Sequence, residues 1–566
     1  FKNQLQSLNL SKKGENMQQH TSPVDSKTNL VQIYGLIFGV LGAILTYYLM
    51  PSNAGEIAQA AAGAKKLNTD GLAIVAAVSV LMGIWWMTEA IALPATALLP
   101  MVLFPLLGVD AFKSAVGPYA SDTIFLFMGG FVLALAMQKW NLHIRIALGI
   151  VLLVGTSPRR LVAGFMIATG FVSMWVSNTA TAVMMLPVGL SVLYLVAKLT
   201  GKQIPQSASV DSQTILEDSA VTQSVQGGVI NTALHGGDDM VQEVKDKTSA
   251  YTSNFGISLM LGIAYAASLG SLGTLIGTPP NAILVGNMKE MGVDIGFGQW
   301  MIMGVPLSIV MLGACWALLV YVLFPPEINE IPGGREVIKK ELQKLGAFST
   351  GEKLVAVIFV LAAFSWVLLG VILKHYGIKI ASLDSIIAMS VAISLFIIPA
   401  NKSGERLIDW ATAKHLPWDI LLLFGGGLAL SAQFSKTGLS LWIGEQVSAL
   451  SSMPMIVIVL AVTALVIFLT EITSNTATAA AFIPVIIGVA TGLGYTEHNV
   501  LLFTIPVALA ATCAFMLPVA TPPNAIAYGS GYMKISHMVK AGFWLNLISI
   551  ALITLVVITI GASVFN

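Results

Sequence analysis

Charged residues are scarce in this chain of 566 residues. Asp, Glu, Lys and Arg make up 10% of it, whereas a soluble domain usually carries about a quarter. The formal net charge is +1, so a broad electrostatic surface for nucleic acid or acidic partners is excluded. Hydrophobic residues make up 56% and the mean hydropathy is +0.82. The composition therefore predicts a multi-pass protein of the cell (plasma or inner) membrane.

Cysteines and catalytic signatures are scarce too. The two cysteines, Cys315 and Cys513, lie in apolar segments, which argues against a disulfide framework or a cysteine-ligated metal site. The chain has no HExxH motif, no GxSxG motif and no paired carboxylates inside its apolar segments. An intramembrane enzyme is therefore a weak alternative, and no organic cofactor is expected.

Long apolar runs, by contrast, are abundant. With about 20 residues per crossing, full membrane spans are expected at 31–50, 71–88, 91–107, 121–138, 300–324, 354–374, 383–400, 418–435 and 541–563. Lys and Arg gather in 139–160, 325–353 and 401–417, which we interpret as cytoplasmic loops, so the N-terminus lies inside and the C-terminus outside. Residues 1–28 are polar and are expected to form a cytoplasmic tail. The first apolar run is too long for a cleavable signal peptide.

One polar motif occurs twice in these apolar surroundings. "SNTATAVMMLPV" begins at Ser177 and "SNTATAAAFIPV" begins at Ser474, 297 residues later, with 8 of 12 positions identical. The apolar arm before the first copy, 161–176, would reach about 24 Å as a helix, short of a crossing of about 30 Å. Each triplet is therefore predicted at the tip of a re-entrant hairpin, one at 161–197 entering from the cytoplasm and one at 454–496 entering from outside. Closed tips favour alternating access over a channel.

A second motif is also duplicated. "TPPNAI" occurs at 278–283 and at 521–526, and each copy interrupts a long apolar segment, 256–288 or 499–532. A double proline removes two backbone donors and forces the preceding residue out of the helix, so each segment is predicted to be a broken helix. "FMGG" and "LFGGG" correspond upstream. The fold class predicted is thus all-α, with two inverted repeats whose matching broken helices indicate a transporter site near the membrane midplane.

The chemistry of these motifs favours ion-coupled anion transport. The stretches 161–197, 255–288 and 499–533 contain no charged residue, and 454–494 contains one, Glu471. A buried dianion without cationic side chains is costly, so co-bound cations are expected to compensate it. Hydroxyls, amides and broken-helix carbonyls suit sodium, while N–H groups at helix N-termini suit carboxylates. Two triplet-plus-break units predict at least two cation sites, one per repeat.

Two alternatives concern single features of these motifs. The triplets could merely hydrogen-bond neighbouring helices, as Ser and Thr often do in membranes, although two copies with matching breaks disfavour this. Glu471, opposite Met174 in the first repeat, is either functional or, as we favour, an acceptor for helix donors at the hairpin.

The motifs resemble a known family. "SNTATAVMMLPV", "GIAYAASLGSLGTLIGTPPNAI", "LTEITSNTATAAAFIPV", "LPVATPPNAI" and "WWMTEAIALPATALLP" are similar to the divalent anion–sodium symporter family, the group with sodium-coupled di- and tricarboxylate transporters. The resemblance runs from about residue 30 to the end. It implies about eleven transmembrane helices, two re-entrant hairpins, a homodimer and an elevator-type movement. The polar stretch 201–254 departs from it and is expected to be a flexible cytoplasmic loop.

The resemblance also implies site residues, position by position. For substrate carboxylates it implies Asn178, Thr179, Asn475, Thr476, Thr521 and Pro522. For a first sodium ion it implies Ser173, Ser177, Asn178 and Gly277, and for a second Thr470, Ser474, Asn475 and Ala520. Ser173 and Thr470 are related by the same offset of 297 residues as the triplets.

The sequence thus divides into a tail (1–28), a first repeat (29–255), its broken helix and following span (256–325), a cytoplasmic linker (326–353) and a second repeat (354–566). The predicted function is sodium-coupled symport of C4-dicarboxylates such as succinate, with the dicarboxylate, sodium ions and the bilayer as partners. A sodium-independent dicarboxylate exchanger on the same fold, or a citrate- or sulfate-selective relative, remains an alternative.

Overall fold

The protein is helical throughout the part of the chain that can be described. The computed structural model describes residues 30–63, 66–155, 157–199, 253–328, 330–331, 333–401, 404–447, 452–495 and 497–565. Within these ranges there is no β-strand, only an isolated bridge between Pro399 and Arg406. The predicted tail at 1–28 and residues 201–252 of the predicted loop lie outside the described residues.

Ten helical stretches in the described ranges are long and apolar enough to cross a membrane. Their main helices are α2 (Leu30–Leu49), α4 (Leu72–Thr88), α8 (Asp122–Lys139), α11 (Asn178–Leu199), α15 (Asn254–Ser271), α17 (Phe297–Ala317), α19 (Thr350–Phe364), α23 (Trp418–Thr437), α26 (Asn475–Gly492) and α29 (Ile535–Val556). The predicted all-α, multi-pass membrane architecture is thereby confirmed.

Shorter helices complete the fold. They are α3 (Ala54–Ala62), α5 (Leu93–Thr96), α6 (Leu99–Leu106), α7 (Phe112–Val116), α9 (Leu142–Val154), α10 (Pro158–Ser173), α16 (Pro279–Glu290), α18 (Gly334–Lys344), α20 (Gly370–His375), α21 (Leu383–Ile397), α22 (Trp410–Ala413), α24 (Leu439–Gln446), α25 (Met455–Thr470), α27 (Leu501–Thr512), α28 (Pro522–Gly529) and α30 (Ala562–Val564).

Two sequence expectations are wrong at this level. The basic stretch at 139–160, expected to be a loop, contains α9, because its polar residues gather at its two ends, whereas residues 146–154 are apolar and pack against α10. The run at 91–107, expected to be one span, divides into α5 and α6, each too short to cross. Pro94 and Pro100 each lie in the first turn of a short helix there, a position that suits proline because its missing N–H is not needed.

The helices end and begin again at both SNT triplets and at both TPPN motifs. Residues 174–177 join α10 to α11, and residues 471–474 join α25 to α26. The first break separates α15 from α16 and the second separates α27 from α28. After each break a threonine, Thr278 or Thr521, stands in extended conformation at the N-cap, and the two prolines form the first turn.

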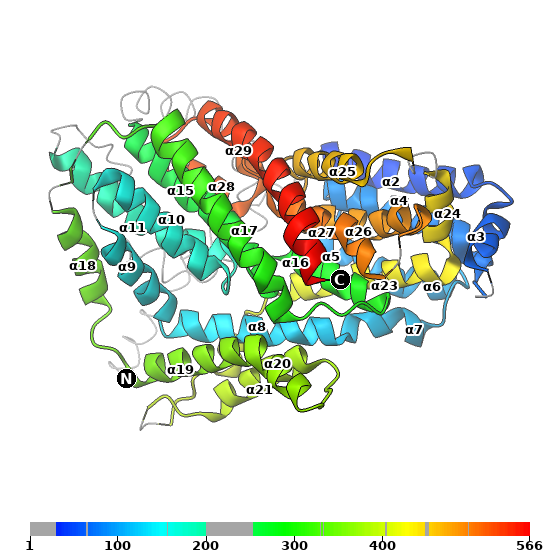
Figure 1. Ribbon diagram of the computed structural model, residues 1–566, viewed down its shortest axis with the longest axis horizontal. Helices are drawn as coiled ribbons and strands as arrows, with labels where there is room; N and C mark the ends of the chain where they lie inside the picture. The colour runs from blue at the N-terminus through cyan, green and yellow to red at the C-terminus, as the bar shows by residue number, and fades with distance from the viewer. Residues whose placement is uncertain are drawn as a thin grey trace, which may run out of the picture.

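The two repeats exchange parts of their broken helices. In the first repeat, α15 packs against α10 and α11, whereas α16 packs against α23, α26 and α27 of the second. In the second repeat, α27 packs against α25 and α26, whereas α28 packs against α11 and α15 of the first. Figure 1 shows α28 beside α15 in one half of the molecule, and α16 beside α26 and α27 toward the other. Each break therefore lies where the chain passes from its own repeat into the other.

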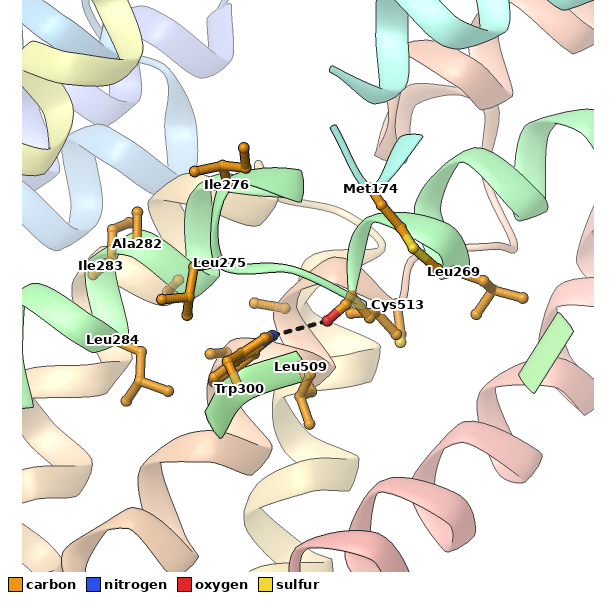
Figure 2. Close-up of a cluster of buried hydrophobic side chains, with 14 of the residues drawn as sticks. Met174, Leu269, Leu275, Ile276, Ala282, Ile283, Leu284, Trp300, Leu509 and Cys513 are labelled. Atoms are coloured by element: carbon orange, nitrogen blue, oxygen red, sulfur yellow. Dashed lines mark hydrogen bonds between the residues drawn. The ribbon is translucent and has the colours of Figure 1, made fainter. Parts of the chain in front are cut away.

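A buried apolar cluster supports the first break. Trp300, on α17, is fully buried and donates from Nε1 to the Leu272 carbonyl at 3.0 Å, the dashed contact in Figure 2. Ser308, also on α17, donates to the Leu269 carbonyl at 2.8 Å. The last carbonyls of a helix have no hydrogen-bond partner within that helix. Side chains of α17 therefore supply donors for two carbonyls at the end of α15.

Reciprocal ion pairs also join the repeats. Lys139 at the end of α8 contacts Asp409 in the second repeat at 2.8 Å, and Lys436 at the end of α23 contacts Asp110 in the first at 2.7 Å. The Lys139 ammonium lowers the pKa of Asp409 to about 2. Burial raises the pKa of Asp110, but hydrogen bonds, above all from Lys436, outweigh it and leave that pKa below its ordinary value. Both aspartates are therefore ionised at any pH above about 4.

Candidate substrate and sodium site

The two asparagines of the SNT triplets occupy equivalent positions. Asn178 is the first residue of α11 and Asn475 is the first residue of α26. The Asn178 Oδ1 accepts from the Ser173 hydroxyl at 3.1 Å, and the Asn475 Oδ1 accepts from the Thr470 hydroxyl at 2.8 Å. The repeat seen in the sequence therefore extends to side-chain geometry, with a hydroxyl five residues before each asparagine holding its amide oxygen.

Each hydroxyl also contacts a backbone carbonyl. The Ser173 Oγ lies 2.6 Å from the Ala267 carbonyl oxygen, and the Thr470 Oγ1 lies 2.9 Å from the Ala511 carbonyl oxygen. A hydroxyl has one hydrogen to donate, so three oxygens in each place share a single proton. We call each set of three oxygens an oxygen cluster. Such a surplus of lone pairs is the environment that a hard cation prefers.

The oxygen clusters are more deeply buried than the amide groups beside them. Ser173 and Thr470 are fully buried, whereas Asn178 and Asn475 are partly accessible. Neither asparagine Nδ2 donates a hydrogen bond within the described part of the chain. Each asparagine can therefore direct its oxygen to a buried cation and its NH₂ group to an anion in the accessible space.

The remaining triplet residues lie at the same helix ends. The exposed Ser177 accepts from the Ala180 N–H at 3.3 Å and so caps α11. Ser474 is half-buried and caps α26 without a side-chain hydrogen bond to the helix. Thr179 and Thr476, also half-buried, follow in the first turns of these helices. The predicted substrate hydroxyls of Thr179 and Thr476 are thus partly accessible, at the first turns of α11 and α26.

The residues before the TPPN breaks differ in how closely the chain approaches itself. Gly277 is buried, and a Cβ at this position would lie 2.2 Å from the Ser271 carbonyl oxygen. Ala520, its counterpart, carries a Cβ and is 7% exposed. The first break therefore requires glycine for steric reasons, and the second does not.

The second break contributes both a buried and an accessible residue. Thr521 is 4% exposed and accepts from the Asn524 N–H at 3.3 Å, and the exposed Pro522 begins α28. At the first break, the Thr278 hydroxyl lies 3.3 Å from the Thr512 hydroxyl at the end of α27. This contact joins the two breaks directly.

The asparagine that ends each TPPN motif closes its break, a role that the motif alone did not predict. Asn281 donates from Nδ2 to the Thr274 carbonyl at 2.9 Å, and Asn524 donates to the Leu517 carbonyl at 3.1 Å. Each bond spans seven residues and closes the loop between the two halves of a broken helix. The signal was available, because this asparagine is identical in the two copies.

Glu471 accepts hydrogen bonds from the loop of the second break. Its carboxylate accepts from the backbone N–H groups of residues 515, 516 and 517 and from the side chain of Asn546 at 2.7 Å. Glu471 is thus an acceptor, as favoured, but its donors belong to the second break and to α29 and not to the predicted hairpin. In the first repeat Met174 stands in its place, and the Met174 carbonyl accepts from the Thr274 hydroxyl instead. The same junction is thus held by a charged group in one repeat and by neutral groups in the other.

Comparison with known proteins identifies the family. Residues 63–565 match the sequence model described as "Sodium:sulfate symporter transmembrane region". This chain belongs to that family. It is 41% identical over 533 residues to the sodium-dependent dicarboxylate transporter SdcS of Staphylococcus saprophyticus, covering 94% of this chain and 91% of that protein. It is 43% identical over 486 residues to SdcS of Staphylococcus aureus, covering 85% of each chain. These relatives are named as transporters, as expected for a chain that is not an enzyme.

A solved structure is also similar. It is the crystal structure of the Alcanivorax borkumensis YdaH transporter, described as having an unusual topology. The TM-score is 0.49 and the sequence identity 13%, over 86% of this chain and 98% of that one.

Proposed function

We propose that this protein transports C4-dicarboxylates such as succinate into the cell together with sodium ions. The observation that carries the proposal is the pair of oxygen clusters, at Ser173 and Asn178 and at Thr470 and Asn475. Membership of the sodium symporter family and the names of the SdcS relatives support it.

The substrate would lie between the two hairpin tips. The Asn178 and Asn475 NH₂ groups, the Thr179 and Thr476 hydroxyls and the N-termini of α11 and α26 all offer donors to carboxylates. Thr521 and Pro522 would border the site at the second break. The stretches that build it contain no Lys or Arg, so sodium ions in the two oxygen clusters supply the positive charge.

The sodium ions and the anion therefore depend on one another. Each asparagine would contact a cation through Oδ1 and the anion through Nδ2, so ordering it for one ligand orders it for the other. Ser177, Gly277, Ser474 and Ala520 would complete the two sodium sites. The buried carboxylate of Glu471 adds negative charge on the side of the second ion.

Translocation would follow an elevator-type alternating access. The two repeats would have inverted topology, with re-entrant hairpins at 161–197 and 454–496, an N-terminus inside and a C-terminus outside. Supporting this, both broken helices exchange halves between the repeats, which makes the two tips and two breaks one packed unit. A homodimer would provide the fixed scaffold.

Purified protein in liposomes tests the coupling. Uptake of labelled succinate is measured with an inward sodium gradient and again with choline in place of sodium. We expect choline to abolish net uptake. Undiminished net uptake in choline would overturn sodium coupling. Labelled uptake in choline that occurs only into liposomes preloaded with unlabelled succinate would instead indicate a sodium-independent exchanger. Competition by unlabelled citrate and sulfate is measured in parallel, and stronger inhibition by either than by succinate would overturn the C4 assignment.

A further inference from the structure

The two broken helices correspond in sequence but differ in how they are covered. Ile276 and Val519 are equivalent, since each stands two residues before the threonine of a TPPN motif. Ile276, labelled in Figure 2, is 5% exposed, whereas Val519 is 56% exposed. Residues 273–278 are all buried, whereas residues 516–518 are partly accessible and Pro522 is exposed. Other elements therefore cover the first break and leave much of the second accessible.

The two triplets show the same difference. Trp175 and Ile472, which are related by the offset of 297 residues, stand two residues before Ser177 and Ser474. Trp175 is 8% exposed, because its ring lies 4.8 Å from that of Phe359 on α19 and 6.2 Å from that of Phe297 on α17, centroid to centroid. Ile472 is 68% exposed. Break and triplet thus agree that the first repeat is covered and the second is not.

A glycine on α8 makes room for the covered break. A Cβ at Gly130 would lie 3.1 Å from two side-chain carbons of Ile276, so a side chain at this position would push Ile276 away. Gly427 on α23 is its equivalent at the offset of 297 residues, in the FMGG and LFGGG motifs. Among the described residues, a Cβ at Gly427 would meet only the Cβ of Ala480 within 4 Å, at 3.6 Å. The same glycine therefore receives a break residue in one repeat and not in the other.

We propose that Gly130 and Gly427 serve in turn as packing sites for the two breaks. In this structure Ile276 packs on Gly130, and in the opposite-facing state Val519 packs on Gly427 while Ile276 becomes exposed. Inverted repeats make this exchange available, because each can adopt the arrangement that the other has. The exchange buries one branched side chain in place of another that differs by a methyl group, so it contributes little to the free-energy difference between the two states. The inference rests on the alternating access proposed above, but not on which ion or anion is carried.

Disulfide cross-linking in liposomes tests the exchange, in a full chain whose two native cysteines are replaced by alanine. Gly427→Cys with Val519→Cys probes the proposed contact, and Gly130→Cys with Ile276→Cys is the matched control for the contact seen here. Under oxidation during succinate uptake, we expect both pairs to lose their free thiols and both to stop uptake until they are reduced. A Gly427–Val519 pair that keeps its thiols while its chain takes up succinate would overturn the proposal, as would failure of the control pair. Failure of the proposed function is distinguishable, because the wild type would then take up no succinate.

A second arm fills the packing site without cross-linking. Gly427→Val should leave succinate binding unchanged, because the state seen here is retained. It should slow uptake about 5- to 150-fold, because the opposite-facing state becomes overpacked. Gly313→Val, on α17 with nothing within 4 Å of an added Cβ, is the control and should transport like the wild type. Should Gly427→Val not bind succinate, Gly427→Ala repeats the test with a methyl group that Ala480 tolerates at 3.6 Å. Uptake at the wild-type rate by the variant that binds succinate would overturn the proposal.

Discussion

At the scale of single residues, the proposed site gives each of the two asparagines two ligands. Replacing Asn178 or Asn475 by alanine should weaken both sodium and succinate binding, because one amide would serve a cation through Oδ1 and an anion through Nδ2. A hydrogen bond to a charged group contributes about 1.5–3 kcal/mol, so each apparent affinity should fall about 10- to 150-fold. Uptake titrations of both ligands measure this. Normal affinities in both variants would show that the hairpin tips are not the site.

Gly277 provides a matched test within one chain. Gly277→Ala would place a Cβ 2.2 Å from the Ser271 carbonyl oxygen, so the backbone before the first break must shift. Overpacking of this kind costs about 1–3 kcal/mol and should lower sodium affinity at the first site. Ala520→Gly, at the equivalent position, removes a methyl group that clashes with nothing and should leave sodium affinity within about twofold. Sodium titration of uptake compares the two, and equal effects would contradict the steric argument.

The sequence could predict these residues only in part. The family resemblance named Ser173 and Thr470 together with their asparagines, and the offset of 297 residues related the two. The structure shows each hydroxyl bonded to its asparagine. The sequence did not predict the third oxygen of each cluster, because the Ala267 and Ala511 carbonyls belong to backbone that any residue type supplies. Their proximity depends on how α15 packs against α10 and α27 against α25, and helix packing is not encoded in a local motif.

At the scale of elements, motifs that act on the local backbone predicted the structure correctly, whereas properties averaged over a long stretch did not. The TPPN breaks were predictable because proline acts on its own and the preceding residue's backbone. The prediction of one span at 91–107 was wrong because mean hydropathy takes no account of Pro94 and Pro100. Helix α9 was not predicted because the basic residues of 139–160 were given more weight than the apolar residues between them. The exchange of helix halves could not be predicted, since it depends on contacts between distant segments.

The crossing of α24 and α26 can be tested by one methyl group. A Cβ at Gly492 would lie 1.7 Å from the Gly444 Cα, so these helices touch backbone to backbone. Gly492→Ala should force them apart and lower the free energy of unfolding by about 1–3 kcal/mol. Gly83→Ala, on α4 with nothing within 4 Å of the added methyl, should be neutral or stabilising. Thermal unfolding in detergent measures both, and an unchanged melting temperature for Gly492→Ala would argue against this close crossing.

At the scale of the whole molecule, the two repeats depend on each other. The Thr278–Thr512 contact, the exchanged helix halves and the reciprocal pairs of Lys139 with Asp409 and Lys436 with Asp110 all cross between them. A substrate held by both tips is therefore held by one packed body. Because both aspartates of these pairs remain ionised above about pH 4, the pairs should persist across the pH range of a transport assay.

The two oxygen clusters also set an expectation for charge movement by the whole protein. One sodium ion in each cluster would balance a dianion such as succinate, so the three ligands together would carry no net charge across the membrane. Each uncompensated charge would couple to the potential by about 2.3 kcal/mol per 100 mV. We therefore expect succinate uptake at a fixed sodium gradient to be independent of potential. The measurement uses liposomes in which potassium gradients and valinomycin set the potential. Faster uptake at an inside-negative potential would require a third sodium ion, and with it a cation site beyond the clusters at Ser173 and Thr470.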